Sequence, residues 1–231
     1  MKTGLGFWKP AASGGGPVFL SHNDLVSTSN GVAGTYTFPI GLGVPDANRA
    51  VVLMASGYRG AAHDITAWSI DDQPLSLIKT PVFGITSNFG RTIVGIGHVP
   101  AGTSGTLSAT YTTAIPNGRI SVYSVYNLSS LEPVDVTEYA VSSTAPGNQS
   151  FSISGAKDGA VLACLTSHRA NDQVWNSGLT TDAVGILGVA AAWRYNHGHS
   201  LIAADGPHNF SCSVSGSSTN ISKGMVAISL R

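Results

Sequence analysis

Two histidines separated by one glycine, His197 and His199, have the residue types and spacing that most suggest chemistry in this sequence. Successive side chains of a β-strand alternate between its two faces, so in a strand both imidazoles would share one face, as they do in metal sites. His168, Asp205 and His208 also carry suitable ligand atoms, but the spacing does not fix any of them as a third ligand. We therefore expect no metal site and no other cofactor.

Aromatic side chains could stack on sugar rings, because such a ring contacts an apolar face and water at the same time. Trp193 and Tyr195 precede the histidine pair, and Arg194 between them would point the other way. We expect one strand face to bind glycan through Trp193, Tyr195, His197 and His199. The remaining aromatic candidates are Tyr58, Trp68, Tyr126 and Trp175.

Carboxylates are scarce, and nothing in the sequence makes two of them converge as glycoside hydrolysis requires. Glu132, Asp135 and Glu138 lie between the two halves of the chain, and Asp71-Asp72 between two apolar runs is typical of a hairpin turn. The sequence has no nucleophile elbow, zinc-protease motif, phosphate-binding loop or dinucleotide fingerprint. We expect a protein that is not an enzyme and has no catalytic residues; a glycan-active enzyme is the alternative.

The elements that must position these residues are short strands. From Pro17 onward, alternating or apolar runs recur between clusters of Gly, Pro, Asn and Asp, and no long helical periodicity interrupts them. The sequence therefore predicts an all-β protein, a β-sandwich or jelly roll. We expect Gly105 to Leu128 to form a β-hairpin, with the turn at Pro116-Asn117-Gly118.

An internal sequence repeat indicates two related halves. Leu107 and Ala109 recur as Cys212 and Val214 at an offset of 105 residues, and the strand pattern beginning at Ala50 recurs at Ala160. Trp68 and Trp175 also correspond, which favours positions in the core. We expect a first β unit with its connector at residues 17–145, a second at 146–231, and an N-terminal arm at 1–16.

Composition limits the partners. Of the 231 residues, 42% are hydrophobic and 10% are charged, and twelve basic side chains balance twelve acidic ones. A neutral surface attracts neither nucleic acid nor anionic membrane over long range, so we expect neither as a partner. Cys164 and Cys212 lie in apolar runs and are expected to be reduced and buried. The first residues lack the apolar core of a signal peptide, and no run is long enough to span a bilayer.

The Gly-rich arm contains one apolar pair, Phe7-Trp8. Such a segment has too little apolar surface to fold alone, so it is either a disordered tail or an arm that becomes ordered on a partner. We expect Phe7 and Trp8 to anchor the chain by filling a pocket on another protein.

The order of strands and turns, with "RAVVLMASGYRG", "GRTIVGIGHVPAGTSGTLSATYTTAIPNGRISVYSV" and the closing "GMVAISLR", resembles a β-sandwich family found among virion proteins of proteobacterial tailed phages and gene transfer agents. The resemblance covers about residues 31–231 and brings no catalytic residues with it. The Gly-Leu-Gly-Phe opening is similar to the N-terminal segments of modular proteins in those particles.

This resemblance implies a non-enzymatic virion protein, displayed as a capsid decoration, a spike or a tail component. Its partners would be other virion proteins, in a homo-oligomer or in many copies per particle, with host surface polysaccharide as a further partner. It would be made in the host cytoplasm and carried on the virion. A dedicated carbohydrate-binding adhesin is the alternative among binding proteins.

Overall fold

The computed structural model describes residues 16–29, 31–59, 64–85, 88–113, 116–169, 172–187, 193–216 and 221–231. All regular structure in these residues is β-strand, which confirms the predicted all-β sandwich. No helix in the described part of the chain is long and apolar enough to cross a membrane. Phe7, Trp8 and the rest of the predicted arm up to residue 15 lie outside the described residues.

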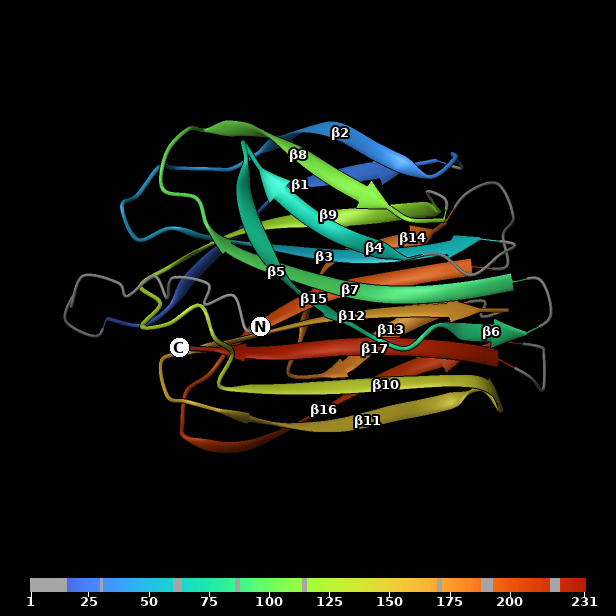
Figure 1. Cartoon of the computed structure of the whole chain (residues 1–231). Coiled ribbons are helices and arrows are strands. Elements are labelled where there is room, and N and C mark those ends of the chain that lie inside the picture. Colours follow the sequence, from blue (N-terminus) through green and yellow to red (C-terminus); the bar gives the residue numbers. More distant parts are fainter. Residues whose placement is uncertain are drawn as a thin grey trace, which may run out of the picture.

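The first unit comprises β1 to β9. Its strands are β1 (Phe19–Thr28), β2 (Gly34–Gly41), β3 (Ala50–Arg59), β4 (Ile65–Ile70), β5 (Gln73–Lys79), β6 (Phe83–Ile85), β7 (Asn88–His98), β8 (Ser104–Tyr111) and β9 (Asn117–Tyr126). They pair in the order β1-β9-β3-β7-β5-β4-β8-β2, with β6 added to β7. The path folds over at the β5–β4 hairpin, so β4, β8 and β2 cover one face of β9, β3 and β7 (Figure 1).

The second unit repeats this pairing. Its strands are β10 (Asp135–Thr144), β11 (Gly147–Gly155), β12 (Ala160–His168), β13 (Asp172–Ser177), β14 (Thr180–Ile186), β15 (Trp193–Leu201), β16 (Gly206–Ser215) and β17 (Ile221–Leu230). One sheet has the order β10-β17-β12-β15-β14 and the other has the order β11-β16-β13. Strand for strand, this matches β1-β9-β3-β7-β5 and β2-β8-β4 of the first unit.

Strand pairing moves the boundary that we expected at residue 145. β10 falls in the segment predicted as a connector of the first unit, yet it pairs with β17 along the edge of the second unit. Its counterpart in the first unit is β1, which pairs with β9 in the same way. Each unit therefore begins with an edge strand, and the second one begins near Asp135.

The predicted hairpin from Gly105 to Leu128 is wrong. β8 pairs with β2 and β4, whereas β9 pairs with β1 and β3, so these consecutive strands lie in facing sheets. Leu107 and Val122 meet in the same core from opposite sides. Alternation predicts two strands that each have one apolar face. Such strands can be neighbours in one sheet, but they can also lie in two facing sheets and bury their apolar faces against each other.

The two units pack against each other through their larger sheets, an arrangement that we call the central interface. Ala50, Val52 and Met54 of β3 point into it and meet Leu162 of β12 and Ile228 of β17, among others. Val51 and Leu53, on the other face of β3, pack in the core of the first unit. A strand with both faces covered is buried throughout, which explains why β3, β12 and β17 are buried along nearly their whole length and each contain an apolar run.

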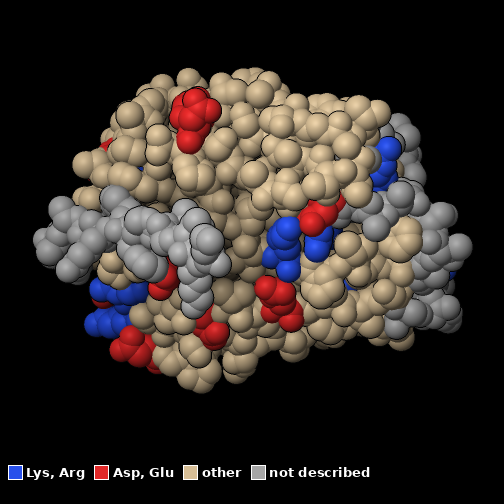
Figure 2. Space-filling model, viewed as in Figure 1, with Lys and Arg blue, Asp and Glu red and all other residues tan. Residues whose placement is uncertain are grey.

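The four layers leave few charged groups on the surface. Figure 2 shows small, separate groups of basic and acidic side chains on a face that is otherwise uncharged. β2 and β8 form the top of the stack and β11 and β16 form the bottom in the same view (Figure 1).

The predicted turn at Asp71-Asp72 is confirmed, since both residues have positive φ and join β4 to β5 in a two-residue hairpin.

Candidate functional site

The four residues predicted to bind glycan do share one face of β15, but that face is buried. Trp193 and His197 are completely inaccessible, Tyr195 is 4% exposed, and the His199 side chain is 24% exposed. β15 is an inner strand whose partners are β12 and β14, and one of its faces lies against the first unit. The expected exposed aromatic surface is therefore wrong at these positions.

Trp193 is a packing residue of the central interface. Its ring lies between Tyr58 of the first unit, at a centroid distance of 5.4 Å, and His168 of β12, at 4.7 Å; both contacts are stacked. Phe83 of β6 reaches the same cluster from the first unit. Because both faces of the indole are already covered, no sugar ring has access to them.

The two histidines connect the units through hydrogen bonds. The ring nitrogens of His197 lie 3.0 Å from the Ser56 hydroxyl and 2.7 Å from the Ser121 hydroxyl, both of the first unit. Burial, with a smaller contribution from nearby His22, lowers the pKa of His197 to about 3, so the imidazole is neutral at physiological pH. His199 contacts the carboxylate of Asp182 at 2.8 Å.

The described residues contain no group of three or more His, Cys, Asp or Glu side chains arranged to hold a metal ion. In the segment between the units, the Asp135 carboxylate accepts hydrogen bonds from the amides of Val136 and Ser154. The described residues therefore offer no group of three metal ligands, and Asp135 faces backbone amides instead of a second acid.

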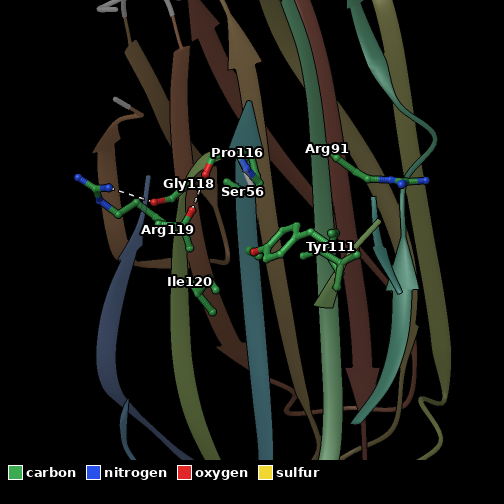
Figure 3. A pocket seen from close by; sticks show the side chains of 12 residues that line it. Ser56, Arg91, Tyr111, Pro116, Gly118, Arg119 and Ile120 are labelled. Atoms are coloured by element: carbon green, nitrogen blue, oxygen red, sulfur yellow. Dashed lines mark hydrogen bonds between the residues drawn. The ribbon is translucent and has the colours of Figure 1, made fainter. Parts of the chain in front are cut away.

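One cavity lies inside the first unit near the beginning of β9. Figure 3 shows Tyr111 pointing into it, while Arg91 and Arg119 point away. Its volume is about 10 Å³, which is enough for about one water molecule. This cavity is too small to be a ligand site.

A larger, open groove of about 650 Å³ lies at the other end of the first unit, where β1 begins and β9 ends. Phe19 and Tyr126 are cross-strand neighbours there, with ring centroids 5.7 Å apart and planes tilted by 33°. The Phe19 side chain is 60% exposed and Tyr126 is partly exposed. Together they form an aromatic platform open to solvent.

The facing wall of the groove is the loop from Gly43 to Asp46, and a buried arginine fixes it. The guanidinium of Arg49, which is completely inaccessible, donates to the carbonyls of Leu42, Gly43, Val44, Val99 and Ala101. The carbonyl oxygens thus compensate the buried positive charge of Arg49, and the same hydrogen bonds hold the loop against the rest of the first unit.

The platform and the wall are also joined directly. The hydroxyl of Tyr126 donates to the Val44 carbonyl at 2.8 Å, and the Ser124 hydroxyl donates to the Leu42 carbonyl. Gly43 has a φ of 69°, and a Cβ there would lie 2.7 Å from Oδ1 of Asn23. The loop therefore fits closely over β1, and the groove is formed before any ligand arrives.

Short polar side chains complete the groove: Ser21, Asn23, Asp46 and Asn127. Oδ1 of Asp46 accepts the amide of Asn48 at 2.7 Å, which orients the carboxylate. Asp46 is the one carboxylate among the described lining residues. Rings with nearby amide, hydroxyl and carboxylate groups allow stacking and hydrogen bonding, whereas hydrolysis of a glycoside would need a second acid.

Sequence reasoning named Tyr126 among the stacking candidates but did not identify Phe19. A signal was present, because Val18 and Leu20 are buried in the central interface and Phe19 between them has the opposite orientation. A large apolar residue at an outward position of an edge strand is the pattern that could have revealed the platform. Trp68 and Trp175, expected in the core, are indeed buried there.

Comparison with known proteins identifies no relative by sequence: no family model matches the chain, and neither does any curated protein. Among solved structures, the ANX2 ectodomain from Arabidopsis thaliana aligns over 92% of this chain and 90% of its own, with 7% identity and a TM-score of 0.26. A β-porphyranase of glycoside hydrolase family 86 from the human gut bacterium Bacteroides plebeius aligns over 85% of this chain and 34% of its own, with 8% identity and a TM-score of 0.24. Neither likeness is close enough to carry an argument about function.

Proposed function

We propose that this chain is a non-catalytic display module that binds saccharide weakly through the groove between the Phe19–Tyr126 platform and the Gly43–Asp46 loop. The observation that carries the proposal is the exposed ring pair beside a loop that Arg49 holds in place. A ligand loses less affinity to ordering costs when the protein groups that contact it are already fixed.

A pyranose ring matches this lining. Its C–H face packs on the aromatic rings, and its hydroxyls reach the side chains of Asn23, Asp46 and Asn127 around the platform. The contact is shallow, so a net binding free energy of about 4 kcal/mol, equivalent to a millimolar Kd, is expected. Many copies on one particle would raise the effective affinity by avidity.

The particle in this proposal is a phage virion or gene transfer agent, with the module anchored through Phe7 and Trp8. The strand-and-turn resemblance, the low charge and the Phe-Trp pair on a Gly-rich segment support this role. Particles assembled with the double variant Phe7→Ala, Trp8→Ala should lack the protein. Normal incorporation of that variant would remove the arm from the proposal.

Saccharide binding is tested with the free protein by NMR titration against a panel of neutral, amino and acidic oligosaccharides. Resonances of Phe19, Tyr126 and Asn127 should shift on binding, and Phe19→Ala should weaken the affinity about tenfold. Val184→Ala is a matched control, because Val184 is 50% exposed on β14 of the second unit, outside the groove. Equal affinity of wild type and Phe19→Ala, or no shift with any saccharide, would overturn the proposal.

A further inference from the structure

The central interface has an apolar part and a polar part. Val94 and Ile96 of β7 belong to the apolar part, whereas Ser56 of β3 and residues of β9 meet β15 and β14 through hydroxyl, imidazole and carboxyl groups. At the centre of the polar part, His197 is completely inaccessible and bonded to Ser56 and Ser121. Each unit supplies part of this network, so the network exists only while the units are in contact.

In the part of the chain that the structure describes, no carboxylate forms a hydrogen bond or ion pair with His197. Asp182 of β14, the acid of this network, accepts a hydrogen bond from the Tyr123 hydroxyl at 2.8 Å and contacts the His199 ring nitrogen at 2.8 Å. The direct partners of His197 are the hydroxyls of Ser56 and Ser121. A positive charge at this position would be buried without a counter-ion, which is strongly unfavourable.

Every strand around His197 contributes to this environment. The nearby titratable or charged groups are His22 of β1, Arg119 and Tyr123 of β9, Cys164 of β12, Asp182 of β14, and Tyr195 and His199 of β15. β3 contributes Ser56 and Met54, and β17 contributes Val226, none of which titrates. The carboxylates in this environment are Asp182 and, beside His22, Asp24, whereas the charge of His22 opposes protonation of His197.

His22 is a second group that favours the closed arrangement only when it is neutral. Its ring lies 5.0 Å from the ring of Tyr123, and its Nε2 is buried without a hydrogen-bond partner. Burial lowers the pKa of His22, although Asp182 and Asp24 act in the opposite direction. Protonation would place a donor without an acceptor inside the interface.

We infer that the central interface is an acid-sensitive lock, in which protonation of His197, assisted by His22, separates the two sandwiches while each remains folded. This goes beyond the proposed saccharide binding and does not depend on it. When the interface opens, His197 regains water and an ordinary pKa near 6.5, compared with about 3 when it is closed. Acid therefore favours the open form: between pH 6.5 and about 3, the opening equilibrium rises about tenfold per pH unit for this residue alone.

Two natural cysteines can report opening and unfolding separately. Cys164 lies in the central interface and is completely inaccessible, whereas Cys212 lies in the core of the second unit and is 1% exposed. Separation of the units exposes Cys164 and leaves Cys212 covered. Unfolding of the second unit exposes both.

The experiment measures labelling of each thiol by 4,4′-dithiodipyridine between pH 7 and pH 4.5, with mass-spectrometric assignment and with rates divided by those of an unfolded reference. From pH 6.5 to 4.5, the normalised rate at Cys164 should rise about 50-fold through His197, and the rate at Cys212 should rise much less. In the His197→Asn variant, the about tenfold rise of the Cys164 labelling rate per pH unit that comes from His197 should be absent.

Parallel increases at both thiols would show unfolding of the second unit and would overturn the lock. An unchanged rate at Cys164, or a full pH dependence in His197→Asn, would overturn it as well. The comparison of the two thiols in the unaltered protein decides the question even if the variant does not fold. X-ray scattering at pH 4.5 provides a second readout: a larger radius of gyration with an unchanged β-sheet circular dichroism spectrum is expected.

Discussion

The two units have the same strand order but place different side chains at equivalent positions of the central interface. Val94 and Ile96 on β7 of the first unit correspond to His197 and His199 on β15 of the second. All four positions pack toward the other unit, yet the first pair is apolar and the second is hydrogen-bonded. The topology thus requires side chains that fill the interface, and it accepts polar ones where the opposite unit supplies partners such as Ser121.

A second difference lies at the beginning of the last strand of each unit. Gly118 of β9 borders the small cavity in Figure 3, and a Cβ there would lie 2.8 Å from the Ser56 carbonyl oxygen. Its counterpart in β17 is Lys223, which is completely inaccessible and donates to the Ala145 carbonyl at 3.2 Å. One unit therefore has no room for a side chain at the position where the other buries a long charged one. Equivalent strands do not imply equivalent interiors.

The largest expected effect comes from Trp193, whose counterpart in the first unit is Gly90. The two positions face each other, since a Cβ on Gly90 would lie 2.4 Å from the indole of Trp193. Trp193→Ala removes a fully buried ring and should lower the free energy of unfolding by about 3–5 kcal/mol in urea titrations. If Trp193→Ala changes stability by less than 1 kcal/mol, Trp193 is not the packing residue described above.

The next effect is acid dependence through His197. Its folded pKa of about 3 lies below the unfolded value near 6.5, so its contribution is fully present above pH 6.5 and is lost as pH falls. Between pH 6.5 and 4.5 the free energy of unfolding should fall by roughly 2 kcal/mol from this residue. Chemical unfolding at several pH values measures the slope. In His197→Asn, the fall in the free energy of unfolding over this pH range should be smaller by the same amount. An unchanged slope would contradict the assignment of the pH dependence to His197.

A smaller effect is expected from Lys223, because burial lowers its pKa. A depressed lysine pKa means that the folded state binds its proton less readily than the unfolded chain, so the destabilising contribution is present at neutral pH and disappears above about pH 10.5. Lys223→Met should raise the free energy of unfolding by about 1 kcal/mol at pH 7, with a smaller gain at pH 10.5. A loss of stability at pH 7 would show that the ammonium group is better satisfied than its single carbonyl contact indicates.

The smallest expected effect concerns the groove of the first unit. Tyr126→Phe keeps the ring but removes the hydrogen bond to Val44, which should cost about 0.5–1.5 kcal/mol of stability. Saccharide affinity should fall by less than in Phe19→Ala, because the stacking surface remains. Thermal unfolding and NMR titration of the two variants give the comparison. A larger affinity loss in Tyr126→Phe would mean that the loop position matters more than the platform.

Local pattern in the sequence was sufficient for the fold class, the repeat and several details. Alternation and turn residues predicted the strands, and nearly constant offsets predicted the correspondence of β3 with β12 and of β8 with β16. The turn at Asp71-Asp72 and the burial of Trp68 and Trp175 were also readable, because each depends on local backbone preference or on a recurring apolar position.

Most of the candidate site could not be predicted from the sequence. The groove joins the beginning of β1, the loop after β2 and the end of β9, three segments that are far apart in the chain. Only strand pairing places Phe19 opposite Tyr126, and only the carbonyl contacts of Arg49 show that the loop is fixed. Neither relation has a signature in local spacing.

The sequence by itself determined which side chains share a strand face, and the tertiary structure decided which faces are covered. Trp193, Tyr195, His197 and His199 do lie together on β15, as their spacing of two requires. Whether that face meets water or another sheet depends on the packing of two units whose strands alternate in the same way. Alternation is a property of the backbone, whereas burial is a property of what lies opposite, so the same four residues became the interior of an interface instead of a surface for sugar.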